Sequence, residues 1–309
     1  MKFKYLIIAF SIIIIFILLI IALLPSFLSN SEAAVNLRVL TLPLFIFMVL
    51  VLVCLGLYFL SNYRLLSLLE REDWPALAYF LEQKLYVKGR YNARRVQLLA
   101  NSYMVISDYP SVLKLEGKAA LAKPSVVEKN VMIFGSARVL SGDYASATAF
   151  FKKYLDKSKL KDRDREWIRW FYGFTQLLGR AFRQAEPEFL SLAESSSDAV
   201  IVALSAYFLD KNLAKYSIKP EECRASAQNG RGRVVEALKT AENWKKEVEK
   251  IENEIHISIV RKYVDEAGKW LFADNVSTKS VFDEEKVETK TPAVAVETEA
   301  EPETDTETL

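Results

Sequence analysis

Three aspartates at equal spacing are the first candidates for chemistry. Asp73 opens DWPAL, Asp108 opens DYPSV and Asp143 opens DYASA, so each stands 35 residues after the one before. Carboxylates brought together in one site could act as a general acid and a general base. Asp is also a residue that caps helices and opens turns. Because each copy stands at a predicted turn, we interpret all three as caps and predict no catalytic residue.

The other reactive side chains are too few to form a metal site or a nucleophilic site. The chain has two cysteines, Cys54 in an apolar run and Cys223 in a polar one, and a single histidine, His256. The sequence has no C-x-x-C, P-loop, G-x-G-x-x-G, H-E-x-x-H or G-x-S-x-G motif. We therefore predict no metal, no cofactor and no enzymatic activity. We expect His256 to be a half-exposed helix residue rather than a ligand.

The neighbours of the aspartates repeat as well, and they indicate a repeated helical unit. When Asp108 is aligned with Asp143, Ala100 falls on Gly135. A tyrosine follows both aspartates, and a tryptophan takes its place after Asp73. Apolar residues recur at three- and four-residue steps on both sides of each aspartate, a spacing typical of helices. Each unit is therefore predicted to be a helix, a tight turn and a second helix.

A period near 34 with small residues in the first helix, a G-D-Y-like turn and a terminal proline resembles the tetratricopeptide repeat. The resemblance covers about 58–210 and includes a fourth unit at 166–199, which follows the charged linker 157–165. Arg138 and Lys159 depart from the repeat pattern. It implies an all-α solenoid of about four units; the alternative is a helical bundle without repeats. In the two best units the matching residues are Leu99, Ala100, Tyr103, Asp108, Tyr109, Ala119 and Pro124, and then Phe134, Gly135, Gly142, Asp143, Tyr144, Ala147 and Phe151.

The same resemblance implies a concave groove, lined by the first helix of each unit, that binds a segment of a partner protein. It implies a non-enzymatic scaffold or adaptor, with the two tryptophans as an aromatic anchor at one end of the groove. Carried over by register, the groove residues are Arg94, Gln97 and Asn101, then Lys129, Met132 and Ser136, then Trp167, Trp170 and Phe174.

Two apolar runs without charge, at about 5–24 and 39–60, precede the repeats. At about 1.5 Å per residue, each is long enough to cross roughly 30 Å of hydrocarbon. They predict a two-span membrane anchor over 1–62, with a cleaved signal peptide as the alternative for the first run. Because neither run contains an ionisable side chain, we expect an anchor rather than a transporter. The second run is expected to continue directly into the first repeat helix.

The distribution of basic residues predicts the orientation of this anchor. Lys2, Lys4, Arg64 and Arg71 flank the spans on one side, and the loop between the spans has only Arg38. By the positive-inside rule, both termini lie in the cytoplasm and the protein is integral to the inner membrane of a bacterium; a periplasmic body is the alternative. A two-span anchor followed by such repeats resembles the bacterial HemY family in architecture only, which implies a pathway-coordinating membrane protein as an alternative function.

The end of the chain is predicted to be a long helix and an acidic tail. A stripe of apolar residues runs through 233–272. This helix is expected to cap the end of the solenoid. The alternative is that it pairs with another helix as a coiled coil, in an oligomeric subunit of a cell-envelope assembly. The preceding segment 211–232 is expected to contain turns and at most a short helix. The tail 273–309 is expected to be disordered; a sharper hypothesis is that it masks a binding surface on the basic body.

Net charge limits the class of partner. The chain has a net charge of +8 over 61–272 and −8 over 273–309. Basic runs with aromatic residues, such as 151–161, could contact nucleic acid, but acidic residues interleave them. Contact with anionic lipid is the simpler explanation for a basic body held beside a membrane. We therefore expect a protein partner and the membrane, disfavour nucleic acid, and keep a homo-oligomer as an alternative.

Overall fold

The computed structural model describes residues 12–17, 19–20, 32–87, 89, 91–156 and 162–273, and within these ranges all regular structure is helical. The predicted all-α class is confirmed for this part of the chain. Most of the first predicted span, part of the charged linker and nearly all of the acidic tail lie outside the described residues. The chain divides into two compact units, Met1–Arg90 and Tyr91–Leu309.

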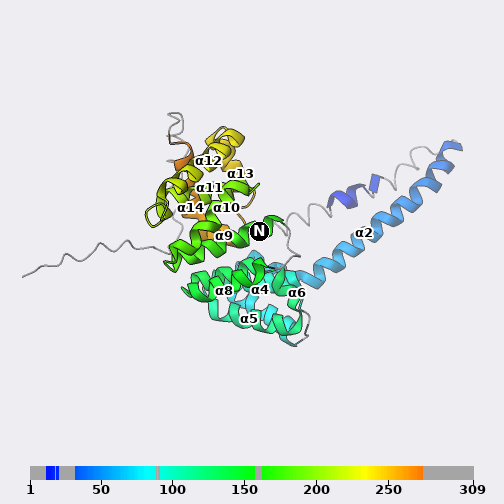
Figure 1. Ribbon diagram of the computed structural model, residues 1–309. Helices are drawn as coiled ribbons and strands as arrows, with labels where there is room; N and C mark the ends of the chain where they lie inside the picture. The colour runs from blue at the N-terminus through cyan, green and yellow to red at the C-terminus, as the bar shows by residue number, and fades with distance from the viewer. Residues whose placement is uncertain are drawn as a thin grey trace, which may run out of the picture. The chain divides into compact units, whose positions relative to one another are not determined.

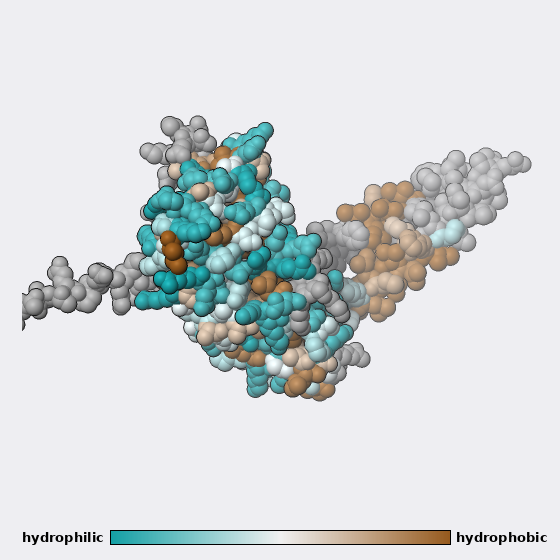
Figure 2. Space-filling view, in the orientation of Figure 1, coloured by the Kyte–Doolittle hydropathy of each residue, from teal (hydrophilic) through white to brown (hydrophobic). Residues whose placement is uncertain are grey.

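The first unit is dominated by one long apolar helix, α2 (Glu32–Glu70), followed by α3 (Trp74–Glu82) and the short π-helix η1 (Gln83–Val87). Its part Ile46–Glu70 has a mean hydropathy of 2.2 and is the one helix of the described residues that is long and apolar enough to cross a membrane. Figure 2 shows the apolar surface of this helix. Because α2 runs unbroken through the end of the second predicted span, the expected continuation of that span into the next helix is confirmed.

The second unit consists of helices that pack largely in chain order (Figure 1). Helix α4 packs on α5, α7 on α8, α9 on α10 and α11 on α12, so that successive pairs form hairpins. Between the pairs, α5 contacts α7, α8 contacts α9, and α10 contacts α11. The bounds are α4 (Ala93–Val105), α5 (Tyr109–Ala122), α6 (Pro124–Glu128), α7 (Val131–Leu140), α8 (Tyr144–Leu155), α9 (Asp162–Leu178), α10 (Phe182–Ser195), α11 (Ala199–Phe208), η2 (Leu209–Leu213), α12 (Pro220–Leu238), α13 (Ala241–Glu249) and α14 (Ile255–Leu271).

The corners between paired helices share one backbone geometry. In each corner a residue with positive φ ends the first helix, and the next N–H donates to the carbonyl five residues back, as in a Schellman motif. At the 108 corner, for example, Ser107 has a φ of 58° and the N–H of Asp108 lies 2.9 Å from the carbonyl oxygen of Tyr103. The positive-φ residues of the four corners are Glu72, Ser107, Gly142 and Arg180.

The repeated aspartates begin the second helix of each corner. The side chains of Asp73, Asp108 and Asp143 accept hydrogen bonds from the N–H groups of Ala76, Ser111 and Ser146. Each therefore satisfies an N–H that the first turn of a helix leaves without a partner. This confirms that the three carboxylates are caps. The fourth corner has Ala181 at this position, without a side-chain cap.

A missing side chain allows the paired helices to approach closely. A Cβ at Gly135 of α7 would overlap the buried ring of Phe151 on α8. At the equivalent place in the next pair, a Cβ on Gly173 would lie 3.3 Å from Cε2 of Phe189. The expected close approach at Gly135 is confirmed, and it explains why a glycine stands in the middle of a helix despite its low helix propensity.

The C-terminal part of the body differs from the sequence prediction. The expected long helix over 233–272 is three helices, because α12 ends at Lys239 with a φ of 66° and Thr240 caps α13. The segment 211–232, expected to hold at most a short helix, contains most of the 19-residue α12. Gly230 does not make a turn there; its Cβ would lie 3.1 Å from Cβ of Ala206, so the glycine allows α11 and α12 to pack.

Helix α14 folds back over helices of several pairs, including α11 and α12 of the last pair. It packs against α7 and α11, and its Tyr263 contacts Phe174 of α9 with ring centroids 5.7 Å apart. Its apolar residues Val260 and Val264 are fully buried. The apolar stripe of this segment is therefore occupied by the body of the same chain.

Candidate functional site

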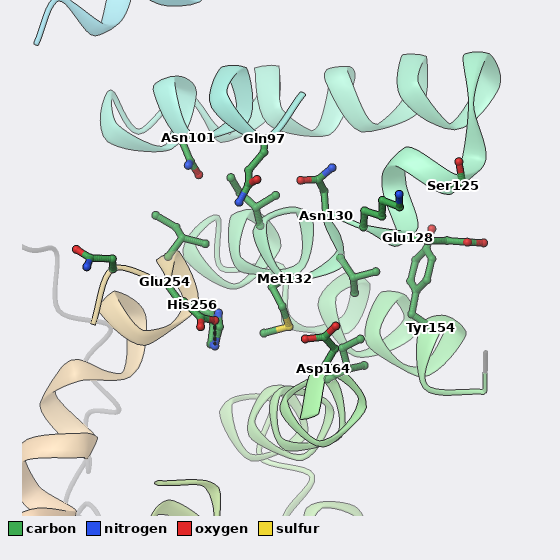
Figure 3. A pocket seen from close by; sticks show the side chains of 16 residues that line it. Gln97, Asn101, Ser125, Glu128, Asn130, Met132, Tyr154, Asp164, Glu254 and His256 are labelled. Carbon is green, nitrogen blue, oxygen red and sulfur yellow. Dashed lines mark ion pairs between the residues drawn. The ribbon is translucent and has the colours of Figure 1, made fainter. Parts of the chain in front are cut away.

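A cleft of about 590 Å³ opens in the second unit between helices that are distant in the sequence. Gln97 and Asn101 of α4 point into it from one side, and Asp164 of α9 from the opposite side (Figure 3). The segment from α6 to α7 forms a third wall, which includes Lys129 and Met132. The start of α14 and the loop before it close the fourth side.

Four of the nine predicted groove residues line this cleft: Gln97, Asn101, Lys129 and Met132. Gln97 and Asn101 come from α4, Lys129 from the end of α6 and Met132 from α7. The remaining five do not line it. Arg94 is exposed on α4, Ser136 is buried in α7, and the three aromatic residues lie in α9.

The expected anchor of two tryptophans is wrong, because both side chains belong to the core together with Phe174. Trp167, Trp170 and Phe174 are 3%, 0% and 2% exposed. Trp170 stacks on Phe174 with centroids 5.0 Å apart, and α14 covers the same face of α9. Helix α14 of the same chain thus occupies the surface of α9 where the sequence predicted partner contacts.

His256 forms the buried part of the cleft wall. It is 3% exposed and packs against Trp167 with ring centroids 4.9 Å apart, so the expectation of a half-exposed residue is wrong. Burial, together with the positive charge of Arg163, lowers the pKa of His256 to about 3. The ring is therefore uncharged at neutral pH. It offers a ligand a hydrogen-bonding nitrogen but is too weak a base to accept a proton from a substrate.

The Nε2 atom of His256 has no hydrogen-bond partner in the structure. It lies 3.4 Å from Oε2 of Glu254, the pair joined by the dashed line in Figure 3, but the alignment is not that of a hydrogen bond. Oδ1 of Asn101 is likewise buried without a partner. Two buried polar atoms of cleft residues therefore lack a hydrogen-bond partner.

The charged residues around the cleft are mainly acidic. Of the residues that the structure describes, Glu128, Asp164 and Glu254 line it with negative charge and Lys129 with positive charge. Burial raises the pKa of Glu254, the charges of Asp164 and Asp198 raise it further, and that of Arg163 opposes them. Among the described residues, no group of three or more His, Cys, Asp or Glu side chains is placed to hold a metal ion. The arrangement is suited to binding a ligand through hydrogen bonds and charge.

The comparison with known proteins identifies the family. A family model described as "Uncharacterised Treponema protein" matches residues 111–273, which is more than half of the chain. The chain belongs to this family. It is also similar to an "Uncharacterized protein" of Treponema pallidum (strain Nichols), to which it is 27% identical over 235 residues that cover 74% of each chain.

The family match includes most of the cleft. It begins in α5 and ends after α14, so that the walls formed by α6, α7, α9 and the start of α14 lie inside it. Gln97 and Asn101 precede the matched residues. The wall that includes Glu254 and His256 is therefore a part of the family region rather than an appendage to it.

Sequence reasoning missed Asp164, Glu254 and His256 as cleft residues. Asp164 stands in a charged run that predicted only a linker, although it lies in the first turn of α9. Glu254 and His256 reach the cleft because α14 returns across α7, and a contact so distant in the sequence has no local signal. The one available hint was the apolar stripe, which required a partner surface somewhere in the molecule.

Proposed function

We propose that this protein is a non-enzymatic, membrane-anchored scaffold or adaptor that binds a segment of a partner protein in the cleft. The observation that carries the proposal is the meeting of Gln97 and Asn101 from one hairpin with Lys129 and Met132 from the next. A tetratricopeptide-like register predicts that these positions share a binding surface. Cleft walls with amide, charged and apolar side chains are also typical of binding sites that fix a ligand by a few polar contacts.

The proposed body is a tetratricopeptide-like solenoid. Its support is the corner geometry, which recurs at Glu72, Ser107 and Gly142 with the spacing of the aspartates and again at Arg180 after the longer linker. The glycines at 135 and 173 stand at equivalent places in successive hairpins. Because each hairpin contacts mainly its neighbours, the packing follows the nearest-neighbour logic of repeat proteins.

The proposed anchor consists of two spans in the inner membrane of a bacterium, with both termini in the cytoplasm. The unbroken helix α2 supports one of these spans, and the distribution of lysine and arginine supports the orientation. A helix that continues past the membrane without a linker would hold the neighbouring structure near the bilayer. The partner would then be captured at the membrane surface.

Affinity capture from native membranes tests this function. The tagged full-length protein is compared with Gln97→Trp, which places a large side chain in the cleft, and with Gln228→Trp, which makes the same change on the exposed face of α12. We expect a discrete partner with the unchanged protein and with Gln228→Trp, and its loss with Gln97→Trp. Equal recovery with all three proteins would exclude the cleft. Recovery of this chain alone would favour a homo-oligomer.

A further inference from the structure

The cleft is acidic although it belongs to a basic body. Among the described residues, its lining has three carboxylates and one ammonium group, whereas residues 61–272 have a net charge of +8. The nearby cation Arg163 is already engaged, with Nε 3.2 Å from Oδ2 of Asp198. The charge of Arg163 also acts on Glu254 and opposes part of the negative charge at the cleft, while Asp164 adds to it.

The cleft also has hydrogen-bonding groups that need a donor. Oδ1 of Asn101 is a buried acceptor without a partner, and the carboxylates of Asp164 and Glu254 accept hydrogen bonds only. The neutral ring of His256, 97% buried, directs a partnerless Nε2 to the same wall. Leaving such atoms without partners has a free-energy cost. A ligand that supplies several hydrogen-bond donors at once therefore gains the most binding free energy.

We propose that the cleft binds the guanidinium or ammonium group of an arginine or lysine side chain, which belongs to an extended segment of the partner protein. Asp164 and Glu254 supply the negative charge, and Asn101 accepts a hydrogen bond. Both cations are rich in donors and have no acceptor, which makes them complementary to this lining. The inference rests on the proposed function, because it specifies the chemistry of the segment that the scaffold binds.

The charges also select against other occupants. The acidic tail of the same chain, with a net charge of −8, is repelled by the carboxylates of the cleft. A cationic segment is attracted to the cleft and repelled by the rest of the basic body. This difference in charge favours binding at the cleft over binding elsewhere on the body. The side-chain amide of Gln97 lies where it can bond the backbone of an extended segment beside the cation.

Peptide binding to the full-length protein in detergent tests the inference. One fluorescent probe is a short peptide of glycine, serine and alanine with two arginines, and the other has citrulline in their place. Citrulline keeps the shape and hydrogen-bonding groups of arginine but has no charge. We expect saturable binding of the arginine peptide and binding of the citrulline peptide that is weaker by about tenfold or more. Equal binding of the two peptides, or no saturable binding of the arginine peptide, would overturn the proposal.

Two double variants locate the binding site. Asp164→Asn with Glu254→Gln removes the negative charge of these two cleft residues. We expect this double variant to bind the arginine peptide about tenfold more weakly and the citrulline peptide with unchanged affinity. Glu236→Gln with Glu249→Gln makes the same charge change at exposed positions outside the cleft. Its affinity for the arginine peptide is expected to stay within about twofold of that of the unchanged protein. Equal losses in both double variants would show that binding follows overall charge and would overturn the proposal.

A competition experiment distinguishes a site for a peptide segment from a site for a small cation. Free argininamide is expected to displace the arginine peptide only at a much higher concentration, because it lacks the neighbouring backbone. Displacement at the concentration of the peptide itself would show that the cleft is a small-molecule site. If Gln97→Trp abolishes capture of a partner but the arginine peptide has no advantage, the scaffold function stands and the cationic specificity falls.

Discussion

The imidazole ring of His256 lies against the indole ring of Trp167, with their centroids 4.9 Å apart. The contact joins the first turn of α14 to α9. It holds in place the wall of the cleft that the start of α14 forms. It also explains two differences from the sequence prediction. Trp167 is buried because α14 covers it, and His256 is buried because Trp167 and Phe171 surround its ring.

Burial of a neutral histidine predicts a loss of stability in mild acid. The pKa of His256 is about 3 in the folded protein and about 6.5 in the unfolded chain, so the unfolded chain binds more protons between these values. The free energy of unfolding should fall by about 1.4 kcal/mol for each pH unit below 6.5. Glu254 acts in the opposite direction, because its raised pKa favours the folded state at low pH.

The pH prediction can be assigned to one residue because the chain has a single histidine. Denaturant unfolding of the full-length protein in detergent is measured from pH 7 to pH 5, a range in which most carboxylates stay ionised. His256→Asn should remove most of the slope, whatever it does to stability at pH 7. A slope that His256→Asn leaves unchanged would show that this ring is not the titrating group.

Two glycines within helices predict opposite effects of the same substitution. Gly135→Ala should lower the free energy of unfolding by about 1–3 kcal/mol, because the new Cβ overlaps the buried ring of Phe151. Gly117→Ala, at an exposed position of α5 with no atom within 4 Å of the new Cβ, should raise it by about 0.5–1 kcal/mol. Similar shifts in denaturant midpoint for both variants would contradict the close packing of α7 and α8.

The shared corner geometry predicts that glycine is favoured where serine now stands. Ser107 has a φ of 58°, in a region that costs a residue with a Cβ about 1–2 kcal/mol, and the equivalent residue of the next corner is Gly142. Ser107→Gly should therefore raise the free energy of unfolding by about 1 kcal/mol. Ser141→Gly is the matched control, because Ser141 has an ordinary φ of −76°, and it should not stabilise the protein.

The sequence predicted the parts of the fold that depend on near neighbours. The corners follow from aspartate and glycine at fixed spacing, and the hairpins follow from apolar residues at helical steps, so both can be seen in short windows. The breaks after Leu238 and Glu249 depend on a φ of 66° at Lys239 and on the return of α14, which no local pattern indicates. For the same reason, Gln97, Asn101 and Met132 could be predicted from the spacing, whereas Glu254 and His256 could not.

The role of the N-G-R-G-R run was also decided by distant contacts. The run, residues 229–233, lies at the end of the segment 211–232 that was expected to contain turns, but its arginines stabilise the ends of other helices. Arg233 donates to the carbonyl oxygens of Ala193 and Ser196 at the end of α10, and Arg231 donates to that of Leu271 at the end of α14. Cations at helix C-termini are favoured by the helix dipole, so helical structure through this run is consistent with its composition.

The proposed orientation can be tested by cysteine labelling. In a variant with both native cysteines replaced by serine, a cysteine is introduced at Gln228, which is exposed on α12. If the body is cytoplasmic, a membrane-impermeant maleimide should label it only after the inner membrane of spheroplasts is opened. Labelling of intact spheroplasts would place the body in the periplasm. A control cysteine at Val87, also exposed but in the first unit, should give the same result.

The most direct test of the central claim is photo-crosslinking from inside the cleft in native membranes. A photoreactive amino acid replaces Met132, which lies in the middle of the lining, and a matched control replaces Gln228. The account predicts one crosslinked protein at Met132 that is absent at Gln228, with mass spectrometry mapping the attachment to a single continuous segment of that partner. The same products at both positions, or no partner at Met132, would contradict the claim that this cleft is the binding site of a scaffold.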